Sequence, residues 1–189
     1  MKVFFTASLR GKKEHDYFYE IIYTSLQQMG YKNVDDEIFR LFEREYYDRI
    51  EKEGRDAYVD LYQRKIKHIQ EAELCIFECT LHSLSIGFLI EKALALNKPT
   101  VVLYLEENIP HFLAGIESEK LFVASYTEET LKEVLKRTID RARDMRDARF
   151  NFFISPSLLT YLEETSKKLG VTKSTFIRNL ITADKKKRG

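Results

Sequence analysis

The sequence predicts an α/β fold in which helices wrap a parallel sheet, followed by a small C-terminal unit. Four short apolar segments support this prediction, because each has the length and residue types of a buried strand: 2–7, 73–79, 100–105 and 120–126. Segment 73–79, ELCIFEC, is apolar along most of its length, which is typical of a parallel strand covered on both faces. Strands that alternate with helices at this spacing indicate a Rossmann-like sheet.

The segments between these strands have the patterns of helices. After the first strand, apolar residues recur at helical spacing until Gly30 ends the pattern: Tyr17, Ile21, Ile22, Leu26 and Met29. Residues 37–70 are charged and aromatic, and they predict one or two amphipathic helices with a break near Gly54. Two further helices are expected, one ending near Leu96 and one over 128–148.

The composition excludes several classes of protein. The chain has 189 residues, of which 44% are hydrophobic and 32% charged, so a globular protein is expected rather than a disordered one. Apolar runs stay shorter than the roughly 18 residues of a membrane span, and the N-terminal stretch is too short for a signal peptide. Cys75 and Cys79 predict buried, reduced thiols. We therefore expect a cytoplasmic protein without a metal site or a cofactor.

The charge is distributed unevenly along the chain. Residues 149–189 contain 9 Lys and Arg against 3 Asp and Glu, although the whole chain has a net charge of only +1. A basic tail on a mildly acidic body is typical of a protein that contacts a polyanion, and a solvated helix face has the same composition. The change of pattern near residue 147 predicts two domains, 1–146 and 147–189.

Two turns that follow predicted strands have the residues of a phosphate site. Ser8, Leu9, Arg10 and Gly11 follow the first strand, and 82–87, HSLSIG, follows the second strand and opens a helix. The free N–H groups and the dipole of a helix N-terminus favour an anion. Because the carboxyl ends of parallel strands meet at one edge of a sheet, both turns are expected at the usual ligand-binding edge.

At these residues the chain resembles the 2′-deoxynucleoside 5′-monophosphate N-glycosidases, within the nucleoside 2-deoxyribosyltransferase-like superfamily. The resemblance covers about residues 2–140 and is densest at SLRG and at ECTLHSLSIGFLIEKALALNKP. It implies a nucleotide or phosphorylated nucleoside as ligand and a dimer with its sites near the subunit interface. The residues that it assigns to the ligand site are Ser8, Leu9, Arg10, Gly11, Ser83, Ser85, Gly87 and Leu89.

The resemblance fails at the catalytic positions. Leu89 stands where the family has its catalytic glutamate, and Lys65 stands where the family has an aspartate that assists departure of the base. Neither residue supplies the carboxylate that glycosyl transfer requires. We therefore expect a protein that binds nucleotides without cleaving them. The alternative is an N-glycosidase or deoxyribosyltransferase that uses Glu91, although two residues along a helix rotate a side chain by about 200°. A structural protein with a vestigial pocket remains a third hypothesis.

The last 41 residues resemble a ribbon-helix-helix unit. Residues 149–155 alternate as a strand, Ser155 and Pro156 open a helix that Gly170 ends, and Thr172 or Ser174 precedes a last helix. In such units the strands of two chains pair and enter the DNA major groove. The resemblance implies base contacts from Arg149, Asn151 and Phe153 and a backbone phosphate near Lys173 and Ser174.

These features predict a homodimer or a higher even-numbered oligomer, because one strand and two short helices are near the lower limit for independent folding. The tail is expected to bind DNA in a ligand-responsive regulator, with dimerisation alone as the alternative.

Overall fold

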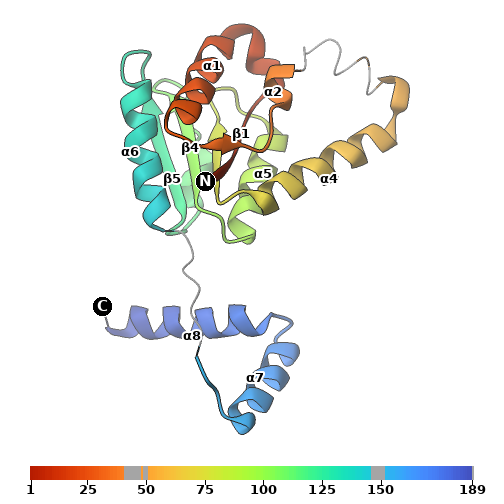
Figure 1. Cartoon of the computed structure of the whole chain (residues 1–189), viewed down its shortest axis with the longest axis vertical. Coiled ribbons are helices and arrows are strands. Elements are labelled where there is room, and N and C mark those ends of the chain that lie inside the picture. The colour runs from red at the N-terminus through yellow and green to blue at the C-terminus, as the bar shows by residue number, and fades with distance from the viewer. Residues whose placement is uncertain (41–47, 49–50, 146–151, 189) are drawn as a thin grey trace. The chain divides into compact units, whose positions relative to one another are not determined.

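The first unit of the protein is a parallel α/β sheet with helices on both faces. The computed structural model describes residues 1–40, 48, 51–145 and 152–188. The chain divides into two compact units, Met1–Asp147 and Ala148–Gly189. The sheet of the first unit has the strand order β2-β1-β3-β4-β5, and every pairing in it is parallel (Figure 1). The strands are β1 (Lys2–Ala7), β2 (Lys32–Asn33), β3 (Leu74–Glu78), β4 (Thr100–Leu105) and β5 (Leu121–Tyr126). The α/β prediction is therefore confirmed.

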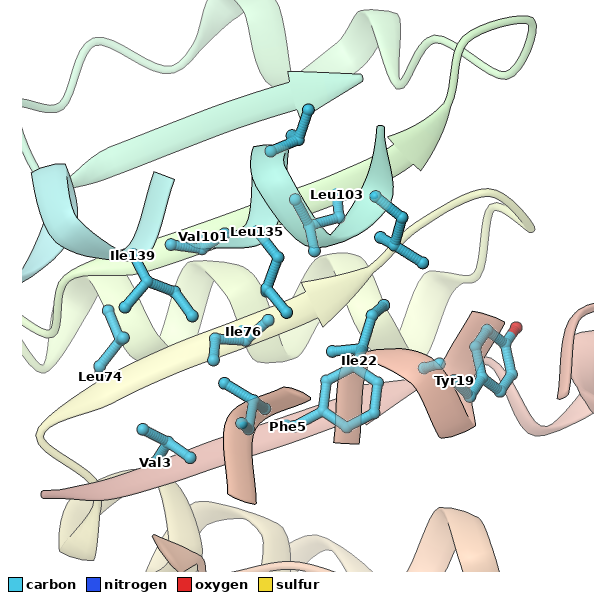
Figure 2. Packing of buried hydrophobic residues seen from close by; sticks show 14 of the residues in the cluster. Val3, Phe5, Tyr19, Ile22, Leu74, Ile76, Val101, Leu103, Leu135 and Ile139 are labelled. Carbon is cyan, nitrogen blue, oxygen red and sulfur yellow. The ribbon is translucent and has the colours of Figure 1, made fainter. Parts of the chain in front are cut away.

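Alternate residues of the central strands divide the hydrophobic core into two layers. Val3, Phe5 and Ile76 face one layer, where α1 (Lys12–Gln28) and α6 (Leu131–Asp144) pack on the sheet (Figure 2). Phe4 and Phe77 face the other layer, which α4 (Arg55–Glu71) and α5 (Leu84–Ala95) cover. Strands buried on both faces explain why their sequences are apolar runs rather than alternating ones.

The second strand, β2, has only two residues, Lys32 and Asn33, and the sequence pattern does not reveal it. Its pairing with β1 depends on specific hydrogen bonds, since the Lys32 N–H donates to the Met1 carbonyl at 3.0 Å. The Phe5 N–H donates to Asn33 Oδ1 at 2.9 Å. The short helix α2 (Glu37–Arg40) follows. Two 3₁₀ turns, η1 (Leu9–Gly11) and η2 (His111–Gly115), follow β1 and β4.

The second unit contains α7 (Pro156–Lys168) and α8 (Lys173–Arg188). The Leu158 N–H donates to Ser155 Oγ at 3.4 Å, which caps the first of these helices. Gly170 has a φ of 67°, a left-handed conformation that glycine adopts readily at a helix end. Residues 152–155 form no strand in the single chain, and the remainder of the expected ribbon strand lies outside the described residues.

Two further observations concern the described part of the chain. Cys75 and Cys79 are buried and unbonded, as the sequence predicts. None of the helices in the described ranges is long and apolar enough to span a membrane.

Candidate functional site

A cavity of about 640 Å³ lies in the first unit, beside the carboxyl ends of β1 and β3. Its volume falls within the range of about 300–1,000 Å³ that is usual for small-molecule sites. Register explains its position, because Ala7 pairs with Glu78 at the ends of two neighbouring strands. The turns that follow these two strands therefore meet, as the sequence predicts for parallel strands.

The first turn, Ser8–Gly11, lines one side of the cavity with Ser8, Leu9 and Arg10. The Gly11 N–H donates to the Ser8 carbonyl at 2.9 Å and closes the turn. Gly11 itself does not line the cavity, and its role is steric. A Cβ atom there would lie 2.6 Å from Tyr19 Oη and 3.3 Å from Leu81 Cβ. Only glycine therefore lets this turn pack against α1 without a shift of its neighbours.

The second turn lines the opposite side with Ser83 and Ser85. Ser83 has extended backbone before α5, and its hydroxyl makes no capping hydrogen bond to that helix. The hydroxyl and the first N–H groups of this 12-residue helix therefore remain available to an anion. Gly87 is exposed and outside the cavity, and a Cβ atom there would meet nothing within 4 Å.

A buried hydrogen-bond network lies below the first turn. Glu78 at the end of β3 is fully buried, and its Oε1 atom accepts hydrogen bonds from Tyr126 Oη at 2.8 Å and from the Thr80 N–H at 3.1 Å. Burial raises the pKa of Glu78, and these hydrogen bonds oppose the rise only partly. Tyr19 Oη lies 3.5 Å from the Ser8 carbonyl, so a buried polar group also contacts the first turn.

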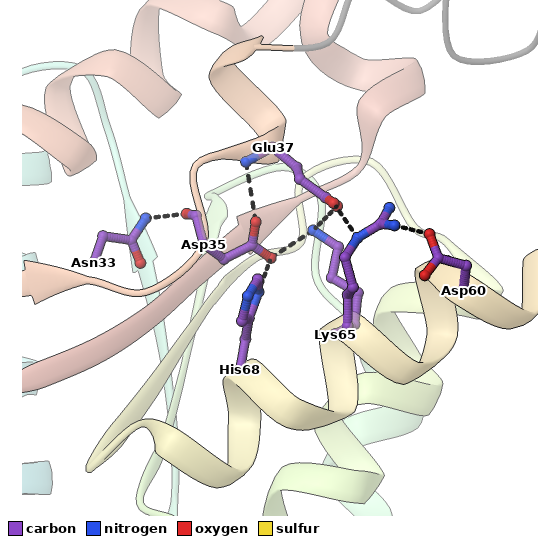
Figure 3. Close-up of polar contacts among 7 residues, drawn as sticks. Asn33, Asp35, Glu37, Asp60, Lys65 and His68 are labelled. Atoms are coloured by element: carbon purple, nitrogen blue, oxygen red, sulfur yellow. Dashed lines mark hydrogen bonds and ion pairs between the residues drawn. The ribbon is translucent and has the colours of Figure 1, made fainter. Parts of the chain in front are cut away.

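A charged cluster of Asp35, Glu37, Arg64, Lys65 and His68 forms the third side of the site (Figure 3). Lys65 Nζ lies 2.5 Å from Asp35 Oδ2 and 3.0 Å from Glu37 Oε2, so one ammonium group bridges two carboxylates. Arg64 Nε donates to Glu37 Oε1 at 2.9 Å. Glu37 and Lys65 line the cavity.

Glu37 is held in its charged form by this cluster. Burial alone would raise its pKa, but the Lys65 ammonium and the Arg64 guanidinium outweigh burial, and the net result is a lowered pKa. The Glu37 N–H also donates to Asp35 Oδ1 at 3.0 Å, which fixes the start of α2. The cavity therefore contains an ionised carboxylate at neutral pH.

The remaining wall of the cavity is apolar and aromatic. Leu61 and Tyr62 project from α4, and Phe88 and Leu89 project from α5. The rings of Tyr62 and Phe88 lie 5.9 Å apart between centroids. Both rings are partly exposed, so they form a surface on which a flat ligand group can stack.

The catalytic positions that the family resemblance assigns hold no acid. Leu89 is only 7% exposed, since it packs in the core as well as against the cavity. Lys65 reaches the cavity as a cation. Glu91, the displaced carboxylate considered from the sequence, is exposed on α5 and does not line the cavity.

The residues expected to contact DNA are only partly described. Arg149 and Asn151 lie outside the described residues, and Phe153 is fully exposed. Lys173 Nζ lies 2.7 Å from Glu163 Oε1, so its charge is paired within the unit. Ser174 is exposed in the first turn of α8.

Comparison with known proteins finds curated relatives and solved structures that are similar to this chain, while no family model matches it. A 5-hydroxymethyl-dUMP N-hydrolase from Danio rerio is 27% identical over 142 residues, which cover 72% of this chain and 94% of the relative. An N-hydrolase of the same name from Mus musculus is 26% identical over 140 residues, covering 71% of this chain and 78% of the relative. The relatives support the nucleoside 2-deoxyribosyltransferase-like superfamily. A solved CMP N-glycosidase from Clostridium botulinum covers 74% of this chain and 99% of its own length at 16% identity, with a TM-score of 0.49.

These relatives correct the main functional expectation from the sequence. A nucleotide-binding regulator that lacks catalysis and binds DNA through its tail is contradicted, because the curated relatives are named as N-hydrolases. The alternative, an enzyme of nucleotide N-glycosidic bonds, agrees better with them. The error arose because the absence of a carboxylate at two positions was taken as absence from the whole site.

Among the cavity residues that the sequence argument missed, Glu37 brings a carboxylate and Tyr62 an aromatic ring. Neither follows a predicted strand, so the reasoning from strand ends does not reach them. The acidic run "VDDE", residues 34–37, which joins β2 to α2, was the available indication of an acidic site there.

Proposed function

We propose that this protein hydrolyses the N-glycosidic bond of a nucleoside 5′-monophosphate. One observation above all supports the proposal: residues 8–10 and 83–86 line the same cavity as an ionised carboxylate, Glu37. A phosphate cradle and a carboxylate in one cavity are what glycosidic cleavage of a phosphorylated nucleoside requires. The names of the curated relatives support the same class of reaction.

The phosphate end of the proposed substrate lies between the two turns. Ser8, Leu9 and Arg10 form one half of this cradle, with Gly11 closing their turn, and Ser83 and Ser85 form the other half. Arg10 is exposed at the cavity and brings a positive charge, while Ser83 brings a hydroxyl that the helix does not use. Charge-assisted hydrogen bonds of this kind are the strong ones.

The base end lies against the aromatic wall. Tyr62 and Phe88 offer ring faces on which a purine or pyrimidine can stack, and Leu61 and Leu89 exclude water beside them. The sugar then lies between cradle and wall, where its anomeric carbon faces the charged cluster.

The test is release of free base from a panel of ribonucleoside and deoxyribonucleoside 5′-monophosphates, followed by chromatography. We expect base and sugar 5-phosphate in equal amounts from at least one nucleotide, and much slower release from the nucleoside without phosphate. The Arg10→Ala protein should show a raised KM for the nucleotide. No base release from any member of the panel by the full chain would contradict the proposal.

We also infer that the second unit pairs with that of a second copy of this chain. Among its described residues, Leu162 and Ser166 have buried side chains, while Phe153, Leu158, Leu169, Leu180 and Ile181 are exposed. A unit of about 40 residues with so little buried apolar surface needs association to be stable.

Sedimentation velocity of the full chain tests this pairing. The wild-type chain and the control Lys186→Glu, which changes a polar position of α8, should sediment as dimers or larger even-numbered species. Leu180→Glu should shift the chain toward monomers, because it places a charge on the apolar face. A wild-type chain that stays monomeric at micromolar concentrations would contradict the inference.

A further inference from the structure

The cavity has a candidate catalytic group at a position where the family resemblance does not place one. Among the described residues that line the cavity, Glu37 is the one with a carboxylate. It is the first residue of α2, and it lies on a different segment from both Lys65 and Leu89, which stand at the family's catalytic positions.

The position of Glu37 is fixed from several sides. The Lys12 ammonium donates to the Ile38 carbonyl at 2.7 Å, which ties α2 to the start of α1 beside the first phosphate turn. Asp35, only 1% exposed, accepts from the Glu37 N–H and from Lys65. Arg64 and Lys65 each contact one of the two oxygen atoms of the Glu37 side chain. A carboxylate held in this way needs little reorganisation during a reaction.

We propose that Glu37 is the general base of the hydrolysis, an assignment that rests on the proposed function. The Glu37 carboxylate accepts a proton from a water molecule as the water oxygen bonds to the anomeric carbon and the bond from that carbon to the base breaks. The electron pair of the broken bond stays on the nitrogen of the base, which takes a proton from Lys65 Nζ at the cavity wall. The proton on Glu37 then returns to Lys65, whose Nζ atom lies 3.0 Å from Glu37 Oε2. The net reaction consumes one water molecule and the nucleotide, and it releases the free base and the sugar phosphate.

The arrangement reverses the charge at position 65, one of the two places where the chain differs from the family pattern. Lys65 puts an ammonium where the resemblance implies an aspartate, and an acid on a neighbouring segment then faces that ammonium. A cation at position 65 alone would leave the cavity without a base. Asp35 and Glu37 together compensate the charge, and only Glu37 does so from within the cavity.

Glu37→Gln tests the assignment, with Glu91→Gln as the matched control on an exposed position outside the cavity. We expect Glu37→Gln to lower kcat for base release by about 10²- to 10⁴-fold, the usual contribution of a general base. Nucleotide-dependent thermal stabilisation should persist in Glu37→Gln, and Glu91→Gln should match the wild type. Absence of base release by the wild-type chain would refute the proposed function. Base release with an unchanged kcat in Glu37→Gln would overturn the assignment of Glu37 alone.

The pH dependence of kcat gives a second test that keeps Glu37 intact. Activity requires the ionised carboxylate, so kcat falls as the pH drops through the pKa of Glu37. Arg64 contacts Glu37 but does not line the cavity, and its loss removes one of the charges that lower that pKa. Arg64→Gln should therefore move the acid limb to higher pH with the plateau retained. Arg64→Lys keeps a positive charge, so its acid limb should lie close to that of the wild type. An acid limb at the same pH in all three proteins would overturn the assignment.

Discussion

Substitution of Gly11 by alanine should destabilise the first unit, because the added methyl group has no space. Its Cβ atom would lie 2.6 Å from Tyr19 Oη, at the end of a ring that is completely buried. Overpacking of this kind costs about 1–3 kcal/mol. Replacing glycine by alanine gains only about 0.4–1 kcal/mol from the unfolded chain, so the cost is the larger effect. For a chain of this size, a net loss of about 1–2 kcal/mol lowers the Tm by roughly 2–8 °C.

Gly87→Ala is the matched control, since a Cβ atom at Gly87 would meet nothing within 4 Å. Gly87 lies within α5, where alanine is more favourable than glycine by about 1 kcal/mol, so this variant should melt at or above the wild-type temperature. Differential scanning calorimetry of the three proteins at one concentration measures both effects. Equal melting temperatures for the two variants, or a Gly11→Ala protein as stable as the wild type, would refute the steric role of Gly11.

Three more predictions concern the cradle and the buried charges. Ser83→Ala should weaken binding of a nucleoside 5′-monophosphate by about 10- to 100-fold in calorimetry, from the loss of one hydrogen bond to a charged group. Binding of the nucleoside and the Tm should stay unchanged, because the hydroxyl does not cap α5; equal losses for both ligands would argue against a phosphate contact. Burial raises the pKa of Glu78, so the folded chain binds the proton of this carboxyl group more tightly than the unfolded chain does. The contribution of Glu78 to stability therefore falls as the pH rises from its pKa in the unfolded chain to its pKa in the folded chain. Glu78→Gln should therefore be more destabilised, relative to the wild type, at pH 4.5 than at pH 7.5 in urea unfolding, and the opposite trend would contradict the raised pKa. Asp35→Asn should lower the free energy of unfolding by about 3–5 kcal/mol, because it removes the buried carboxylate that pairs with Lys65. A loss below about 1 kcal/mol would show that Glu37 alone is enough to compensate the charge of Lys65.

Much of the first unit follows from the sequence because its strands are buried on both faces. The apolar runs at 2–7, 73–79, 100–105 and 120–126 agree with β1, β3, β4 and β5 to within about one residue. A strand of two residues such as β2 has no pattern of its own, and its pairing depends on hydrogen bonds to β1, including those of Lys32 and Asn33. Local patterns thus identify strands that bury side chains but miss those that depend on a few tertiary hydrogen bonds.

The residues of the candidate site likewise fall into those that the sequence predicts and those that depend on tertiary packing. Ser8, Arg10 and Ser83 could be grouped in advance, because parallel topology forces the turns after neighbouring strands together. Glu37 and Tyr62 reach the cavity through the packing of α2 and α4, which no spacing in the sequence encodes. Glu91 follows Leu89 by two residues, and helix geometry predicts that its side chain points away from the site. The structure agrees, because Glu91 is exposed outside the cavity.

The parallel pairing of β1 with β3 links nucleotide binding to the order in which the chain folds. The two halves of the cradle follow β1 and β3 and are far apart in the sequence. They meet only after the long segment between them has closed into a loop, which costs conformational entropy. A chain in which these strands have not paired therefore lacks the cavity, and the nucleotide of the proposed function would bind only the assembled sheet. By mass action, ligand at a hundred times its Kd stabilises that state by about 2.7 kcal/mol. The concentration of substrate in the cell would thus influence how long each copy of the protein resists proteolysis.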